Sequence, residues 1–344
     1  MPRSTWTWGW AVALLALGLA LVVLFALPTG QYLILPGSTL NLNRIVHVHG
    51  ERPPAHGRIL MVAVSVAPAD YLQVLTARFQ AGEELVPAGE LMPAGMSFEQ
   101  YIRLSMLQMN QSHSAAQVAA FHALDLPVRT LRPEVYVAGV VAPGPSNGRL
   151  QVMDLIRTVN GVPVRTAAQL VTQVHAMRPG TTVRLQVVRN GKTRTVAVRT
   201  GRSPTTPGSA FLGIELMQVL PYKFPRQVTI DTNDIGGPSA GMMMSLAIIA
   251  QIDPHARFPG RAVVAGTGEI TASGQVQPIG GVAEKVITAY RSGARLFLCP
   301  QANYAAAVAV QRALHIPIRI VAVKSLAQAL NAVGYTRSPR TLAG

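Results

Sequence analysis

The sequence predicts a multi-domain α/β protein that begins with a transmembrane helix. The chain has 344 residues, 49% of them hydrophobic, which is enough to bury two or three separate cores. An uncharged apolar run fills residues 10–27. After this run the sequence pattern predicts strands and a long helix, then short hairpins, and then strands alternating with helices. Each part is justified below in chain order.

The apolar run WAVALLALGLALVVLFAL at residues 10–27 has about the length that crosses a bilayer. Trp6, Trp8 and Trp10 would form an aromatic belt at the interface. A cleaved signal peptide is the alternative, but the run exceeds a usual signal core and no small-residue cleavage site follows it. We therefore expect residues 1–9 to be cytoplasmic and the bulk of a single-pass cell-membrane protein to be extracytoplasmic.

The formal net charge of +15 comes from scattered Lys and Arg residues, without a basic run or interleaved aromatic residues. This distribution argues against nucleic acid and favours an anionic lipid bilayer as a partner. The single cysteine, Cys299, excludes an internal disulfide and a cysteine-only metal site. His47, His49 and His56 lack a carboxylate or thiol to complete a metal site. No metal or cofactor is expected.

Residues 40–124 are expected to form a small α+β region next to the membrane. Apolar alternation in LNRIVHVHG and GRILMVAVSV, between residues 42 and 67, predicts two strands joined as a hairpin by ERPPAHG. Ser97 and Gln100 form a capping box that opens a helix, or a pair of helices, over 97–124. The helix or helix pair is expected to be structural.

Residues 125–201 carry two Asn-Gly hairpin signals, at Asn160 and Asn190, with one predicted helix, TAAQLVTQVHAM, between them. The segment resembles a bacterial PDZ domain, which implies a groove for an extended peptide or a chain terminus. Two features depart from the family pattern: Met153 replaces a common glycine before Asp154, and no G-L-G-F-like loop precedes Tyr136. The tripeptide GKT at 191–193 fits a hairpin tip better than a phosphate loop.

A Pro/Gly/Ser-rich linker at 202–208 leads to the last predicted domain, residues 209–335. It contains Ser239 in the sequence GGPSAG, directly before a nearly all-apolar helix. Glycines permit a close backbone approach, and the first amides of a helix attract negative charge. Gly237 to Gly241 also match the G-x-S-x-G pattern of a nucleophile elbow. A helix-capping serine is the simpler alternative.

A second candidate group lies on the predicted helix at 282–291. Val282, Val286, Ala289 and Tyr290 form its apolar stripe, and Lys285 falls on the same face. Burial disfavours the ammonium form and lowers the lysine pKa, so that the amine can act as a general base. A desolvated lysine can take the proton of a serine hydroxyl without a histidine. The polar residues Glu284, Thr288 and Arg291 are expected to point away from this face.

The blocks GGPSAG and GTGEIT…PIGGVAEKV, in this order, resemble the proteolytic domain of the Lon family of Ser-Lys peptidases. With the anchor and the PDZ segment, the chain is similar to the YlbL-like, PDZ-containing, membrane-anchored Lon-like proteases. The resemblance implies an ATP-independent serine endopeptidase that cleaves polypeptides, with Ser239 as nucleophile and Lys285 as base. It also implies a possible homo-oligomer, because Lon relatives form rings.

The resemblance further implies supporting roles around the dyad. Thr267 aligns with a family threonine near the lysine, and backbone around Gly237, Pro238 and Ser239 would hold the oxyanion. The chain departs from the family at Gly236, where an aspartate is common. Asp234, two residues earlier, is the nearest carboxylate.

Two other functions stay open from the sequence. A Ser-Glu-His hydrolase would use Ser239 with Glu269 or Glu284 and then His315, which follow in the required chain order. A catalytically inactive PDZ scaffold would only bind partners.

Overall fold

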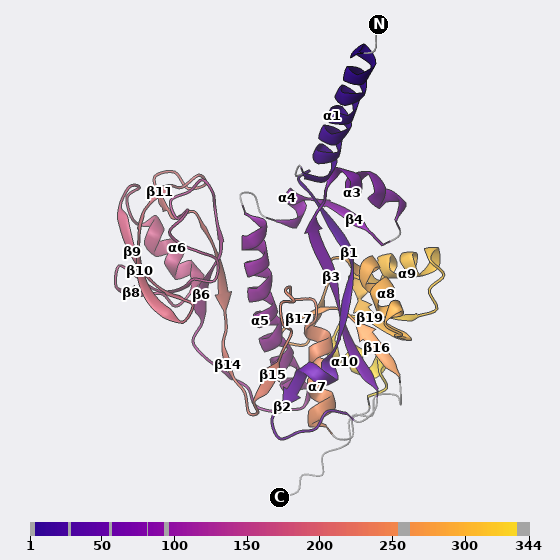
Figure 1. Cartoon of the computed structure of the whole chain (residues 1–344). Coiled ribbons are helices and arrows are strands. Elements are labelled where there is room, and N and C mark those ends of the chain that lie inside the picture. The colour runs from indigo at the N-terminus through magenta and orange to yellow at the C-terminus, as the bar shows by residue number, and fades with distance from the viewer. Residues whose placement is uncertain are drawn as a thin grey trace, which may run out of the picture.

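The structure, a computed structural model, describes residues 4–26, 29–54, 57–80, 82–92, 96–253 and 262–335. A long N-terminal helix leads into a mixed sheet covered by helices, and a second sheet lies to one side (Figure 1).

The first helix, α1 (Ser4–Ala26), projects away from the rest of the molecule (Figure 1). Trp10, Leu14 and Leu15 on it are exposed. Among the residues that the structure describes, no helix combines the length and the hydropathy needed to cross a bilayer. Since a span needs about 20 consecutive apolar residues, this finding overturns the predicted transmembrane helix at 10–27. The side chains of Trp6 and Trp8 lie outside those described.

The main sheet joins strands from both ends of the chain. Its order is β20–β19–β16–β3–β1–β4. The strands β1 (Gln31–Asn41), β3 (Arg58–Pro68) and β4 (Glu84–Pro87) are antiparallel neighbours, whereas β3, β16 (Val263–Gly266), β19 (Leu296–Pro300) and β20 (Arg319–Val323) run parallel. The early strands therefore belong to the same sheet as the strands around residues 263–323.

The hairpin expected within residues 42–67 does not form. Residues 42–45 form a short helix, α2 (Leu42–Ile45), because the Asn41 side chain accepts a hydrogen bond from the Asn43 amide. The following strand, β2 (Val46–Val48), pairs with β15 (Val228–Ile230) instead. The side chain of Gln251 bonds the Val46 carbonyl and the Val48 amide, so the other edge of β2 is also occupied.

Helices cover both faces of the main sheet. On one face α7 (Gly241–Ile252) is completely buried, with α5 (Phe98–Ala123) and α10 (Leu326–Ala332) packed around it, which explains its apolar residues on every side. On the other face lie α8 (Val282–Arg291) and α9 (Tyr304–Ala313). The expected capping box of α5 is confirmed, and the helix is single and 26 residues long.

The second sheet is built by β6 (Glu134–Val140), β7 (Leu155–Val159), β9 (Thr182–Arg189), β10 (Lys192–Arg199) and β13 (Ile214–Val219), in the order β10–β9–β7–β6–β13. Helix α6 (Ala167–His175) contacts β13 and shares the core of this sheet. Both Asn-Gly hairpins are confirmed: Asn160, Gly161, Asn190 and Gly191 have positive φ at the turns β7–β8 (Val162–Pro163) and β9–β10.

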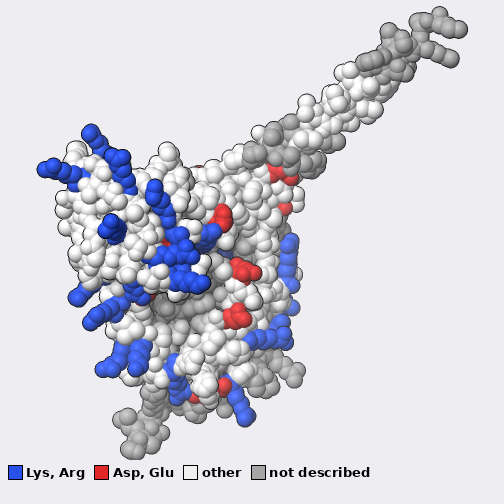
Figure 2. Space-filling model, turned by 60° about the vertical axis from the view of Figure 1, so that its left-hand side comes forward, with Lys and Arg blue, Asp and Glu red and all other residues white. Residues whose placement is uncertain are grey.

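A two-stranded stalk connects this second module to the rest. The segments that enter and leave it, β5 (Arg129–Thr130) and β14 (Tyr222–Lys223), pair with each other. Residues 125–219 hold twelve Lys and Arg against four Asp and Glu, and Lys and Arg gather over this side of the molecule in Figure 2. The smaller elements are α3 (Tyr71–Thr76), α4 (Ala88–Leu91), β11 (Gly201–Arg202), β12 (Ala210–Phe211), β17 (Glu269–Ile270), β18 (Val276–Gln277) and the 3-10 turns Ala77–Phe79 and Gln301–Asn303.

Candidate active site

Ser239 and Lys285 meet at the centre of the large domain. Ser239 lies two residues before the first turn of α7, and Lys285 lies in the first turn of α8, on the opposite face of the sheet. The Lys285 Nζ atom is 3.0 Å from Ser239 Oγ and 3.3 Å from the hydroxyl of Thr267, which follows β16. The Thr267 hydroxyl in turn donates to the Ser239 carbonyl at 3.1 Å. One threonine therefore contacts both halves of the pair.

The Lys285 amine is almost completely removed from solvent, with 3% of the residue exposed. Burial lowers the pKa of Lys285 to about 8, and the neighbouring Glu284 carboxylate opposes this effect more weakly. A pKa in this range leaves a substantial fraction of neutral amine at mildly alkaline pH. The geometry and the pKa together suit a base that accepts the Ser239 proton.

The face of α8 opposite the predicted apolar stripe is more buried than the sequence suggests. Glu284 and Thr288, expected to point away from the buried face, are themselves 2% and 4% exposed because α8 also packs against β1. Burial raises the pKa of Glu284, and its Oε2 atom has no hydrogen-bond partner among the described residues. Arg291 alone of the three is exposed.

Helix α5 holds the loop that carries the serine. The Gly237 amide donates to the Ser105 carbonyl at 2.7 Å, and the Ser112 hydroxyl donates to the Pro238 carbonyl at 2.9 Å. Gly237 has a φ of 90°, which favours glycine. Because the Gly237 N–H is engaged and proline has none, the Ser239 and Ala240 amides are the loop donors left to bind an oxyanion.

Ser105 and Ser112 could not be identified as site residues from the sequence. They lie in a predicted helix more than a hundred residues before Ser239, and no motif marks them. Only the packing of α5 against α7 brings them to the loop.

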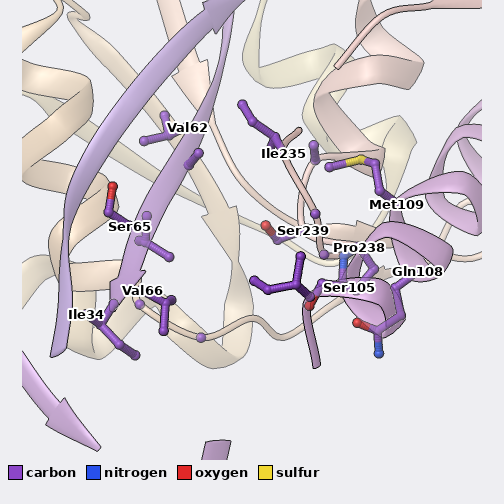
Figure 3. A pocket seen from close by; sticks show the side chains of 18 of the residues that line it. Ile34, Val62, Ser65, Val66, Ser105, Gln108, Met109, Ile235, Pro238 and Ser239 are labelled. Atoms are coloured by element: carbon purple, nitrogen blue, oxygen red, sulfur yellow. The ribbon is translucent and has the colours of Figure 1, made fainter. Parts of the chain in front are cut away.

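A cavity of about 440 Å³ opens beside the serine. Figure 3 shows Ser239 between β3, which carries Val62 and Val66, and the loop that carries Ile235 and Pro238. Side chains from α5, including Met106 and Met109, complete the walls, and the lining is mostly apolar. The charged groups at its edge are Lys285 and Asp234.

The residues of the alternative Ser-Glu-His arrangement form no hydrogen-bonded triad with Ser239 in the described part of the chain. Glu269 follows Gly268, whose amide donates to the Ser239 carbonyl at 2.7 Å, and Glu284 precedes Lys285 on α8. His315 is exposed just after the end of α9, and Glu269 lies on β17, where burial raises its pKa. In the described part of the chain, no hydrogen bond joins either residue to Ser239 or Lys285. Over the same residues, no cluster of His, Cys, Asp and Glu suits a metal ion, and His56 falls outside them.

Two models of known protein families match this chain, one in each module. Residues 231–334 match the family model of the Lon protease (S16) C-terminal proteolytic domain, and residues 111–200 match a PDZ domain model. The chain therefore carries a Lon-type serine protease domain and a PDZ domain.

The curated relatives match in the protease domain. The Lon protease of Trichlorobacter lovleyi is 36% identical over 94 residues, which are 27% of this chain and 11% of that protein. The Lon protease of Roseiflexus castenholzii is 49% identical over 67 residues, and that of Escherichia coli 48% over 67, each covering 20% of this chain and 8% of the relative. The matched region thus spans about a tenth of the length of these relatives.

Among solved structures, the PDZ domain of an SdrC-like protein from Listeria monocytogenes is 23% identical, covers 24% of this chain and 86% of its own, and has a TM-score of 0.23. A solution structure of a Geobacillus thermodenitrificans protein is 30% identical, covers 24% of this chain and 94% of its own, and has a TM-score of 0.22.

Proposed function

We propose that the protein is a serine endopeptidase that cleaves polypeptides with a Ser239–Lys285 dyad. The observation that carries the proposal is the 3.0 Å contact between the serine hydroxyl and a lysine amine that is 3% exposed. A serine is a weak nucleophile until a neighbouring base accepts its proton, and an ordinary solvated lysine is protonated at neutral pH. Here burial lowers the pKa of Lys285, so that part of the amine is neutral and can accept the serine proton.

The steps follow from the geometry. Neutral Lys285 takes the proton from Ser239 Oγ as the oxygen attacks a peptide carbonyl. The Thr267 hydroxyl accepts one N–H of the amine and so directs its lone pair to the serine. The Ser239 and Ala240 amides stabilise the oxyanion. The lysine ammonium then protonates the leaving amine, and a water molecule, deprotonated by the same lysine, hydrolyses the acyl-enzyme.

The same proposal includes independence from ATP. The tripeptide GKT at 191–193 belongs to the turn and first residues of the β9–β10 hairpin, as expected from the sequence, and not to a strand-to-helix phosphate loop. Peptide cleavage should therefore be equal with and without ATP and Mg²⁺.

The PDZ module is proposed to recruit polypeptides. Its strand β13 has β6 as its sheet neighbour on one side, and α6 packs near it; the Ala167 amide at the start of α6 donates to the Gln218 side chain. An edge strand beside a helix is the arrangement to which an extended peptide adds as a further strand. The segment Phe211–Ile214, which precedes β13, supplies the glycine turn absent before Tyr136, with Gly213 at a φ of 69°.

Ser239→Ala, Lys285→Ala and Lys285→Arg test the dyad. Each should lose cleavage of casein and of a fluorogenic peptide while keeping its melting temperature within a few degrees, since arginine cannot deprotonate near neutral pH. Lys192→Ala, at the exposed β9–β10 turn, is the matched control and should keep full activity. An active Ser239→Ala protein would refute the proposal, and an inactive His315→Ala protein would favour the Ser-Glu-His alternative.

A further inference from the structure

The exposed charges around the active-site cavity are acidic, although the chain as a whole is basic. The chain has 30 Lys and Arg against 15 Asp and Glu. Among the described residues within two positions of the cavity lining, the exposed charged residues are Glu90, Glu99, Arg103 and Asp234. Arg103 forms an ion pair with Glu99, so these two charges offset each other. Glu90 and Asp234 remain, and both are negative.

Asp234 lines the cavity itself. It lies on the loop that carries Ser239 and directly precedes Ile235, which Figure 3 shows at the cavity beside Ser239. Among the described residues, no hydrogen bond or ion pair engages the Asp234 carboxylate. The other charged residue of the lining, Lys285, is buried and bonds Ser239. The Asp234 carboxylate is therefore free to bind a cationic group of a substrate.

A buried carboxyl lies directly behind the cavity wall. Glu284 is 2% exposed, and its Oε2 atom has no hydrogen-bond partner among the described residues. An added Cβ on Gly281 would lie 3.5 Å from this oxygen and 3.1 Å from Val64 Cγ1. Gly281 and Val64 both line the cavity, so the unpaired oxygen borders it. A cation in the cavity would stabilise the charged form of Glu284.

The net charge of +15 does not cancel this local field. Exposed charges separated by more than the Debye length, about 8 Å at physiological salt, are largely screened. In the described part of the chain, the cations within two positions of the lining are Arg103, which is paired with Glu99, and the buried Lys285. A group that enters the cavity therefore interacts with Asp234 more strongly than with the scattered arginines.

We infer that the enzyme prefers substrate segments that carry a lysine or arginine close to the scissile bond, and that Asp234 binds this cation. The inference rests on the proposed peptidase function and names the class of segment that is cleaved. An opposite charge at the cavity edge attracts a cationic side chain and repels an acidic one, so it discriminates between substrates more than it adds affinity. Asp234 is thus a specificity-determining residue.

The test compares peptides that differ by one charge. The parent is a ten-residue fluorogenic peptide of uncharged residues. Each position close to the scissile bond is replaced in turn by lysine, by acetyl-lysine, which has a similar shape but no charge, and by glutamate. At the position that faces Asp234, kcat/KM should be about fivefold higher with lysine than with acetyl-lysine, the upper range for one exposed ion pair. Glutamate should be poorer than acetyl-lysine, and all differences should shrink at high salt.

Variants of Asp234 show whether this residue causes the preference. The ratio of kcat/KM for lysine to that for acetyl-lysine is taken within each variant, so a general loss of activity cancels. Asp234→Asn should bring the ratio to about one, Asp234→Glu should keep it above one, and Asp234→Lys should bring it below one. Glu90→Gln is the matched control, because it removes a negative charge that does not line the cavity. Its ratio should stay within about twofold of wild type.

The possible outcomes separate this inference from the function on which it rests. If no peptide of the series is cleaved, the peptidase proposal itself fails. If peptides are cleaved but lysine gives no advantage at any position, or Asp234→Asn keeps the wild-type ratio, the role of Asp234 is refuted and the peptidase proposal stands. A general preference for glutamate would also refute it, since the net charge of the chain would then govern the choice of substrate.

Discussion

The protonation of one amine sets the pH dependence of the proposed reaction. Burial lowers the pKa of Lys285 to about 8, and the base must be neutral to accept the Ser239 proton. Activity should therefore rise about tenfold per pH unit below pH 8 and level off above it. A peptide assay from pH 6 to pH 10 measures the midpoint, with circular dichroism to confirm the fold at each pH. A rate that is already maximal at pH 6 would contradict the role of Lys285.

Ser112 is expected to position the oxyanion donors through the loop backbone. Its hydroxyl is 2.9 Å from the Pro238 carbonyl, and the residue is 4% exposed. Loss of this bond frees the peptide before Ser239 to rotate. Ser112→Ala should lower kcat about tenfold, somewhat less than loss of a direct oxyanion donor. The KM and the pH midpoint should stay unchanged, since neither the cavity walls nor Lys285 are altered.

Ser114 offers the matched control on the same helix. Its hydroxyl bonds the Asn110 carbonyl one turn earlier and is solvent exposed. Ser114→Ala should have normal kinetics. The affinity for a peptide boronate, which mimics the tetrahedral intermediate, should fall in Ser112→Ala in parallel with kcat. An unchanged boronate affinity, or a shifted pH midpoint, would assign Ser112 a different role.

At the scale of elements, the close contact between α5 and the catalytic loop depends on a glycine. An added Cβ on Gly236 would lie 2.7 Å from the Ser105 side chain and 3.0 Å from its backbone. Gly236→Ala should therefore push the loop off α5 and lower activity at least about tenfold, with about 1–3 kcal/mol lost from the free energy of unfolding. Gly89→Ala, where an added Cβ meets nothing within 4 Å, is the control. Equal activity of the two variants would show that the loop does not need this contact.

The sequence predicts the elements whose signals are local. The apolar stripe of α8 places Lys285 on a buried face, the Asn-Gly pairs mark two hairpins, and Ser97 marks the start of α5. These patterns depend on neighbours within one or two turns, so they can be recognised without the fold.

Other features arise from contacts between distant segments. The pairing of β3 with β16 joins residues about 200 positions apart, and the side chain of Gln251 occupies one edge of β2. No local sequence pattern indicates which distant strands pair, and for this reason the predicted hairpin at 42–67 was wrong. The support of the loop by Ser105 and Ser112 is hidden for the same reason. The predicted membrane span failed differently, since an apolar run is only a necessary condition for a span.

At the scale of the whole molecule, the two modules have separate cores. The buried residues of the PDZ module form one cluster, and those around α7 and α8 form others. The module leaves and rejoins the protease domain at the paired residues Thr130 and Tyr222. Because these two residues are already antiparallel partners, an Asn-Gly turn can join them directly and complete a hairpin.

Replacing residues 131–221 with Asn-Gly should therefore leave a folded protease domain. We expect its kcat/KM for a short apolar peptide to stay within about threefold of the full chain, because Ser239, Lys285, Thr267 and α5 are all retained. Cleavage of an unfolded protein such as casein should fall about tenfold or more. The full chain is proposed to bind such a substrate at β13 as well as at the active site, and without β13 the local substrate concentration is no longer raised. Unchanged casein cleavage would show that the PDZ module does not recruit this substrate. A folded variant unable to cleave the short peptide would show instead that the module helps to form the active site.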